Sequence, residues 1–375
     1  MIILKKFLID ACEKDACEVD ERARGELSQL TARFQLARVS HARVQLFVLF
    51  LILLISISGC RGRGDTKTSI EDVRVGTQGI VMSFLPNSPP DTIHIDADNT
   101  FDVLLEVRNL GAFPQPEEIS KIFSDNEFGR IHLSGYDINI LLFDYTGLGL
   151  DYRRLNGRST INPNGGEDVL KFKGEVIVNH LNVEKYEPTL LVTACYKYAT
   201  IAGPPVCIDP QPYSTVRERR VCEVQDISLS SQGAPVAVTK IEEEALAQKT
   251  LFKITIKNVG NGDIIKLESY NKCNPFYTAD GKLEREDIDK VNLVEARIGD
   301  KSLQCAPFID DEVKSTSGYV RLINGEGTII CELPKSEYAG SKTAYTTPLQ
   351  IVLSYVYRNT INKRLQIIKE STSIG

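Results

Sequence analysis

The sequence lacks the residue patterns of the common catalytic chemistries. Its histidines are His41, His94, His132 and His180. None of them lies in an H-E-x-x-H zinc-protease motif, and there is no G-x-S-x-G, Walker or Rossmann glycine pattern. Residues 96–99 read DADN but lack the glycine and the distal glutamate of an EF-hand loop, so they are better interpreted as a turn. We therefore expect no enzyme activity, no cofactor and no metal site.

Other absences narrow the class of partner. There is no N-x-S/T sequon, so N-linked glycans are not expected. Residues 61–375 contain 36 basic and 43 acidic side chains, a net charge of −7, without a basic cluster that alternates with aromatic residues. Nucleic acid is therefore not an expected partner.

The chain has one long apolar run, Val44–Cys60, which reads VQLFVLFLILLISISGC. Its 17 residues would span about 25 Å as a helix, against a hydrocarbon core of about 30 Å. This length is short for a transmembrane helix and long for the apolar part of a signal peptide. A retained transmembrane helix and a cleaved lipoprotein signal are both open, and either one predicts association with a membrane.

The residues around the run bear on this choice. Its end, Ile57-Ser58-Gly59-Cys60, resembles the lipobox of prokaryotic lipoproteins, which makes Cys60 the candidate lipidation site. Residues 1–43 contain eight basic and seven acidic side chains, unlike a short, positively charged signal segment. They are either a cytoplasmic tail or the product of a start placed too far upstream. The long tail favours the retained helix.

Six of the nine cysteines follow the apolar run. They are Cys195, Cys207, Cys222, Cys273, Cys305 and Cys331. Their number is even and none forms a C-x-x-C pair, so disulfides are favoured over a zinc site. Disulfides persist in oxidising compartments. We therefore expect residues 61–375 to be extracytoplasmic.

Residues 61–375 show short alternating apolar runs separated by Gly, Pro, Asn and Asp, which is typical of β-sandwiches. Phe101–Gly111 (FDVLLEVRNLG) resembles Leu251–Gly260 (LFKITIKNVG), with an offset of 149 between Asn109 and Asn258. An offset of 159 joins Gly166-Glu167 to Gly325-Glu326 and Tyr196-Lys197-Tyr198 to Tyr355-Val356-Tyr357. These three anchors indicate a duplication.

The fold expected is all-β: two tandem immunoglobulin-like sandwiches after an N-terminal membrane helix. The expected organisation is a tail (1–43), the apolar segment (44–60), a linker (61–68), a first domain (69–215) and a second domain (216–375). The boundary is placed near residues 210–222, around Pro210-Gln211-Pro212.

The two V-x-N-x-G-like strand ends are similar to those of CARDB-type and related immunoglobulin-like domains of archaeal and bacterial surface proteins. They are Val107-Arg108-Asn109-Leu110-Gly111 and Ile256-Lys257-Asn258-Val259-Gly260. Asn tolerates the left-handed backbone region and Gly needs no side-chain clearance, so both suit a turn. The resemblance implies sandwiches used for adhesion, spacing or assembly, and it assigns no catalytic residue.

The Tyr-x-Tyr strands predict which side chains face the core. Tyr196 and Tyr198 share one face with Val192 and Ala194, and Cys195 lies on the opposite face with Thr193 and Lys197. The segment Gly203-Pro204-Pro205 is interpreted as the turn of a hairpin, which predicts a Cys195–Cys207 disulfide. Three pairings of the other four cysteines remain, and we favour Cys273–Cys305 with Cys222–Cys331.

Two functions fit these observations. The first is a membrane-anchored extracytoplasmic protein that binds another surface or envelope protein, in adhesion or surface assembly. The second is a surface hydrolase or solute-binding lipoprotein with a site between the domains or in the insertion 271–305. A hydrolase site would need carboxylates such as Glu284, Asp287 or Asp310-Asp311 to meet a histidine. The first function is favoured.

Overall fold

The computed structural model describes residues 73–369, apart from 96–98, 116, 124–126, 146, 178–180, 182–183, 215–220, 277–280 and 310–312. The chain divides into two compact units, Met1–Thr66 and Lys67–Gly375, and the described residues all belong to the second. Within these residues, no helix is both long and apolar enough to cross a membrane. The apolar run Val44–Cys60, its candidate lipidation site Cys60 and the tail 1–43 lie outside the described residues.

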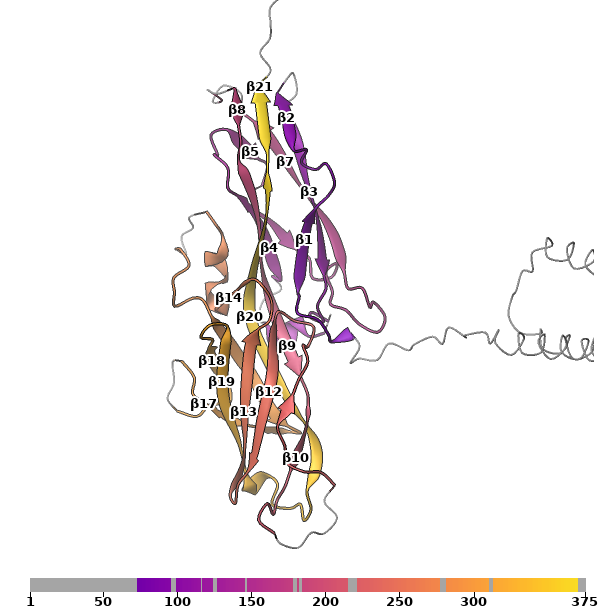
Figure 1. Cartoon of the computed structure of the whole chain (residues 1–375), viewed down its shortest axis with the longest axis vertical. Helices are drawn as coiled ribbons and strands as arrows, with labels where there is room; N and C mark the ends of the chain where they lie inside the picture. The colour runs from indigo at the N-terminus through magenta and orange to yellow at the C-terminus, as the bar shows by residue number, and fades with distance from the viewer. Residues whose placement is uncertain are drawn as a thin grey trace, which may run out of the picture. The chain divides into compact units, whose positions relative to one another are not determined.

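The unit Lys67–Gly375 is almost entirely β, which confirms the predicted fold class at this level (Figure 1). The strands of the first half are β1 (Ile80–Phe84), β2 (Thr92–Ile95), β3 (Thr100–Asn109), β4 (Gly129–Ser134), β5 (Leu141–Phe143), β6 (Gly147–Leu150), β7 (Glu167–Val176), β8 (Lys185–Tyr186), β9 (Thr189–Ala202) and β10 (Pro205–Ile208). Those of the second half are β11 (Ile227–Ser228), β12 (Val236–Ala245), β13 (Lys249–Asn258), β14 (Asp263–Ile265), β15 (Lys290–Ile298), β16 (Lys301–Ser302), β17 (Gln304–Ala306), β18 (Gly318–Arg321), β19 (Glu326–Pro334), β20 (Tyr345–Arg364) and β21 (Gln366–Lys369). The helical elements within residues 80–369, over the described positions, are α5 (Ile119–Ile122) and the 3₁₀ turns η2 (Leu267–Cys273) and η3 (Lys335–Glu337).

The strands of the described residues form four sheets in a sandwich-like arrangement. A four-stranded sheet has the order β1-β3-β7-β5, and a five-stranded sheet has the order β11-β12-β13-β19-β17. Between the two halves of the sequence runs a nine-stranded sheet with the path β16-β15-β20-β9-β4-β6, to which β10, β14 and β18 also pair. A small sheet, β2-β21-β8, contains the parallel pair β2–β21.

The strand pairing matches the offsets predicted for a duplication. The β3–β7 ladder pairs Arg108 with Glu167, and the β13–β19 ladder pairs Lys257 with Glu326. These partners are related by the offsets of 149 and 159 found in the sequence. The two halves therefore repeat not only short motifs but also the ladder that joins them.

The strands β9 and β20 pair along 14 residues and carry the two halves in one sheet. The β20 strand first pairs with β15 and β10. It then continues beside β9 (Figure 1). After β20 the chain enters β21, which pairs with β2 and β8 of the first half. The boundary predicted at 210–222 falls between β10, which ends at Ile208, and β11, which begins at Ile227. The last 25 residues of the described chain, 345–369, pair with strands from both sides of it.

The Tyr-x-Tyr face is the core face, as predicted. Tyr196, Tyr198, Tyr355 and Tyr357 are at most 3% exposed, and neighbouring rings lie 5.6–6.4 Å apart between centroids. The ladder pairs Tyr196 with Tyr357 and Tyr198 with Tyr355, so the four rings meet where the two halves meet. Burial raises the pKa of Tyr196 and of Tyr355 well above the usual value, so these hydroxyls stay neutral.

Each predicted N-x-G turn is bound by one of these tyrosines. The Tyr198 hydroxyl donates to Asn109 Oδ1 at 3.0 Å, and the Tyr357 hydroxyl donates to Asn258 Oδ1 at 3.3 Å. Neither asparagine has a left-handed backbone, so the expected reason for Asn is wrong. The side-chain amide is used instead, since Asn109 Nδ2 and Asn258 Nδ2 also donate to backbone carbonyls.

The expected reason for Gly in these turns is confirmed. A β-carbon at Gly111 would collide with the Tyr198 hydroxyl, and one at Gly260 would collide with the Tyr357 hydroxyl. The same Tyr–Asn–Gly arrangement therefore occurs at equivalent positions of both halves. A tyrosine from a shared strand occupies the space that a glycine leaves, and its hydroxyl binds the asparagine two residues before that glycine.

Candidate functional site

A cavity of about 300 Å³ lies on the outer face of the nine-stranded sheet, opposite the tyrosines. The strands β9, β14 and β20 contribute Thr193, Asp263, Arg358 and Thr360. The end of η2 and the insertion after it contribute Lys272, Cys273, Asn274, Pro275, Phe276, Lys282 and Leu283. The cavity is therefore formed by both halves of the sequence, and it includes part of the insertion 271–305 in which a site was expected.

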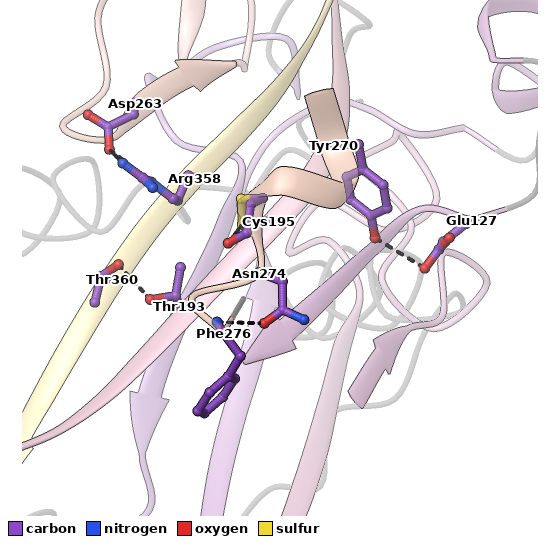
Figure 2. Close-up of a disulfide and its surroundings, with 10 residues drawn as sticks. Glu127, Thr193, Cys195, Asp263, Tyr270, Asn274, Phe276, Arg358 and Thr360 are labelled. Carbon is purple, nitrogen blue, oxygen red and sulfur yellow. Dashed lines mark hydrogen bonds and ion pairs between the residues drawn. A yellow bond between two sulfur atoms is a disulfide. The ribbon is translucent and has the colours of Figure 1, made fainter. Parts of the chain in front are cut away.

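The period of two along the strands places these side chains on one face. Two rows of cross-strand neighbours run over the sheet here. One row is Arg130, Cys195, Arg358 and Asp263, and the other is His132, Thr193 and Thr360. Thr193 and Thr360 share a hydrogen bond of 2.9 Å between their hydroxyls (Figure 2). The prediction that Thr193 and Cys195 point away from the tyrosine face is confirmed by this arrangement.

A disulfide fixes the insertion to the sheet. Cys195 of β9 is bonded to Cys273 at the end of η2, with 6.3 Å between their Cα atoms (Figure 2). The two cysteines form a small buried apolar cluster with Ile265 and Val356. The cavity is thus bounded at one side by a covalent link between its sheet and its cover.

All six cysteines after the apolar run form disulfides, as expected, but the predicted pairs are wrong. The bonds are Cys195–Cys273, Cys207–Cys222 and Cys305–Cys331. The prediction of Cys195–Cys207 assumed a hairpin at residues 203–205. Instead, β9 and β10 both pair with β20 in the same direction, so the chain continues past Gly203-Pro204 rather than turning back. Twelve residues of extended chain separate two Cα atoms by roughly 40 Å, far beyond the reach of a disulfide.

The other two predicted pairs fail for related reasons. Cys273 is bonded to β9, so it is not the partner of Cys305. Cys305 of β17 lies directly opposite Cys331 of β19, with 4.0 Å between the Cα atoms. Cys222 is then bonded to Cys207, 5.7 Å away between Cα atoms, and not to Cys331.

Ion pairs and hydrogen bonds set the charge pattern around the cavity. Arg358 donates from Nε at 3.0 Å and from Nη2 at 2.7 Å to Asp263 Oδ2 (Figure 2). Lys272 Nζ lies 3.0 Å from Asp287 Oδ2. Burial opposes ionisation of Asp287, but hydrogen bonds from Ser269, from the backbone of Glu284 and from Lys272 outweigh it and lower the pKa of Asp287. Asp287 therefore holds η2 and is used structurally.

Two further contacts hold η2 to the rest of the fold. Tyr270 donates its hydroxyl to Glu127 Oε1 at 3.2 Å (Figure 2). Lys197 Nζ lies 4.8 Å from the centre of the Tyr270 ring. Glu127 lies two residues before the start of β4, and Lys197 belongs to β9. The cover of the cavity is therefore held by the disulfide, an ion pair and an aromatic contact.

The carboxylates proposed for a hydrolase site do not meet a histidine in the described part of the chain. His132 of β4 is 6% exposed, and burial together with the charge of Arg130 lowers its pKa to about 4, against a smaller raising effect of Glu127. Gly147 of β6 passes so close to His132 Nδ1 that a β-carbon there would meet it. Asp310 and Asp311 lie outside the described residues. Over the described ranges, no group of three or more His, Cys, Asp and Glu side chains is placed to hold a metal ion.

The sheet side of the cavity could not be found from the sequence. The sequence Arg358-Asn359-Thr360 resembles a short hairpin turn, but in the structure it lies inside the continuous strand β20. Nothing in the spacing of Arg358, Thr360 and Asp263 connects them with Thr193. The only available signal was the alternation that placed Thr193 and Cys195 on a face of their own. The sequence does not indicate which strand pairs with β9, because the paired residues of β9 and β20 are about 160 positions apart.

Comparison with known proteins adds little to this geometry. Neither a known protein family nor a curated protein matches the chain. A solved structure, the collagen-binding domain of the surface protein RspB from Erysipelothrix rhusiopathiae, aligns with 78% of this chain and 97% of its own length. The sequence identity is 9% and the TM-score is 0.10, so this alignment carries no argument.

Proposed function

We propose that this chain is a membrane-anchored extracytoplasmic protein whose β halves are immunoglobulin-like modules for binding another surface or envelope protein. The observation that carries the proposal is the set of three disulfides that uses every cysteine after the apolar run. Such disulfides form and persist outside the reducing cytoplasm. The apolar run Val44–Cys60 supplies the anchor, as a retained helix or through lipidation of Cys60.

The sandwich-like β structure supports an interaction role. The duplicated halves repeat the strand ends that resemble CARDB-type domains, and they present several exposed strand faces. Among the exposed apolar side chains are Ile161, Tyr213, Val221 and Ile323, each at least 69% exposed. These side chains come from different segments of the chain, and no single binding patch is assigned to them. The partner proposed is therefore a protein of the same membrane or surface, without a surface assigned to it.

The compartment is tested by adding protease to intact cells that produce the full chain with a tag at its C-terminus. Loss of the tagged region 61–375 is expected without lysis. Protection of this region until the cells are lysed would overturn the proposal. A cytoplasmic protein followed in the same cells serves as the control for intactness.

The mode of anchoring is tested with Cys60→Ala. If the run is a signal with a working lipobox, the variant loses incorporated lipid label and accumulates as a larger precursor. If the run is retained as a helix, the variant and the parent chain have the same mobility. The interaction itself is tested by cross-linking on intact cells. A reproducible partner with an extracytoplasmic domain, captured in both directions, is expected, and no such partner would count against the interaction role.

A further inference from the structure

The cavity between β9, β14, β20 and the segment after η2 has the properties of a small-molecule site. Its volume of about 300 Å³ is at the lower end of the range found for ligand pockets. Its sheet side presents hydroxyl groups of Thr193 and Thr360, and its cover presents Asn274 and the ring of Phe276. Polar groups at fixed positions beside an aromatic surface are typical of ligand pockets.

The walls of this cavity are held in place without a ligand. The Cys195–Cys273 disulfide ties the cover to the sheet, and the Thr193–Thr360 hydrogen bond joins the two strands beneath it. The chain after the disulfide turns at Asn274, whose Oδ1 accepts a hydrogen bond of 3.0 Å from the Phe276 backbone N–H (Figure 2). A pre-formed cavity lowers the ordering cost of binding.

The charge of the walls points to an anion. Three cationic side chains line the cavity, Lys272, Lys282 and Arg358, against the one carboxylate of Asp263. This excess of positive charge stands in a chain whose net charge is −6. Lys272 is shared with Asp287, but Lys282 is exposed and Arg358 uses two of its five N–H donors on a single oxygen of Asp263.

Arg358 is the group best placed to bind an oxyanion. Its planar guanidinium suits two-point binding of a carboxylate or a phosphate. Its present partner, the Asp263 side chain, is 58% exposed and occupies the position that a ligand oxyanion would take. Ion pairs as exposed as this one contribute little to stability, so an incoming anion displaces Asp263 at small cost.

We propose that this cavity binds a small organic anion through a carboxylate or phosphate group held by Arg358 and Lys282, with the rest of the ligand against Phe276 and the two threonines. The inference goes beyond the interaction role of the chain and does not depend on it. It would hold equally if no protein partner existed.

The test uses the purified full chain in detergent and measures binding by calorimetry with two probes, glucuronate and inorganic phosphate. Glucose is the uncharged counterpart of glucuronate. Binding of at least one anion and no binding of glucose are expected. The anion that binds shows whether a carboxylate or a phosphate is preferred. Failure of both anions to bind at millimolar concentration would overturn the proposal.

Variants on the two sides of the ion pair should change the affinity in opposite directions. Arg358→Gln removes the charge-assisted bonds and should weaken binding by about tenfold or more. Asp263→Asn frees the guanidinium and should strengthen binding. The matched control is Arg364→Gln, since Arg364 lies on the same strand outside the cavity lining and its side chain is 73% exposed. Equal affinities of the parent chain and Arg358→Gln would refute the site.

Lys282→Gln keeps the test decisive if Arg358→Gln does not fold. Lys282 is exposed and pairs with no strand, so its replacement should leave the thermal midpoint of unfolding unchanged. It should still weaken binding of the same anion several-fold. Unchanged binding in Lys282→Gln together with unchanged binding in Asp263→Asn would contradict the proposal.

Discussion

The hydroxyl groups of the buried tyrosines bind turns of the chain at the place where the two halves meet. Tyr198 binds Asn109 Oδ1, and its oxygen also accepts a hydrogen bond from the Phe113 backbone N–H at 3.4 Å. The same oxygen fills the space above Gly111. Removal of this hydroxyl leaves a buried donor at Phe113 without its partner, and such a donor costs about 1–3 kcal/mol.

We therefore expect Tyr198→Phe to lower the free energy of unfolding by about 1–2 kcal/mol, as measured in denaturant on residues 61–375. Tyr357→Phe, at the equivalent position, should have a similar effect. Tyr145→Phe is the control, because the Tyr145 side chain is 63% exposed. If Tyr198→Phe and Tyr145→Phe have the same free energy of unfolding, the Tyr198 hydroxyl does not stabilise the contact between the two halves.

Glu243 of β12 predicts a pH dependence. The residue is 8% exposed, its Oε2 accepts a hydrogen bond of 3.1 Å from the Cys207 backbone N–H, and its Oε1 is buried without a partner. Burial raises the pKa of Glu243 to about 7, against a smaller lowering effect of the Cys207 hydrogen bond. The folded chain therefore holds this proton more tightly than the unfolded chain, for which the value is 4.5.

The stabilising contribution of protonated Glu243 is fully present below about pH 4.5 and is lost as the pH rises through about 7. Between pH 5 and pH 8 the parent chain should lose stability relative to Glu243→Gln by about 1–3 kcal/mol. His132 has the opposite dependence, since its pKa of about 4 makes its contribution disappear as the pH falls below about 6.5. The difference between parent and variant isolates Glu243, and a constant difference across this range would contradict the assignment.

The disulfides show that a cysteine can be assigned to the correct face of its strand while its bonding partner is predicted wrongly. The alternation along β9 correctly placed Cys195 opposite the tyrosines, and the even number of cysteines correctly indicated disulfides. The pairing failed because Gly203-Pro204-Pro205 has the composition of a turn but interrupts a strand that continues along β20. Local composition indicates where a strand is interrupted, but it does not indicate whether the chain reverses direction there.

The ladders β3–β7 and β13–β19 could be predicted better than the cavity. Their motifs recur at fixed offsets, and the period of two fixes which side chains face the core. The β9–β20 ladder could not be predicted, because antiparallel strands with similar alternation are interchangeable until tertiary packing selects one partner. The cavity depends on that selection, so its sheet side was invisible in the sequence.

The observed disulfides close loops of different length, and the chain-entropy model predicts a larger stabilisation for the longer loop. Cys195–Cys273 spans 78 residues and Cys207–Cys222 spans 15. Replacing both cysteines of a pair by Ala should cost about 4–5 kcal/mol for the first and about 3 kcal/mol for the second. Denaturant unfolding measures both, and non-reducing peptide mapping of the parent chain checks the pairs. A larger loss for the 15-residue loop would show that loop entropy does not set the order.

At the scale of the whole molecule, the two halves of the sequence do not form two separate β structures. The β20 strand pairs with β15 and β10 and then with β9, and β21 completes a sheet with β2 and β8. A fragment of residues 61–215 would expose the edge of the 14-residue β9 strand and would lack the central strand of the β2-β21-β8 sheet. Unpaired strand edges favour aggregation.

This arrangement bears on whether a half of the sequence can fold alone. Residues 61–215 by themselves should show no cooperative unfolding transition, because their core lacks Tyr355 and Tyr357, whose rings neighbour Tyr198 and Tyr196. Residues 61–375 should unfold in one transition, because the β9–β20 ladder and one continuous apolar core couple the halves. Mixing fragments 61–215 and 216–375 during refolding should restore that transition, which circular dichroism in denaturant can follow. A cooperative transition with a strand-dominated spectrum from 61–215 alone would show instead that β20 is dispensable to the first half, and that the shared sheet joins two modules that are already complete.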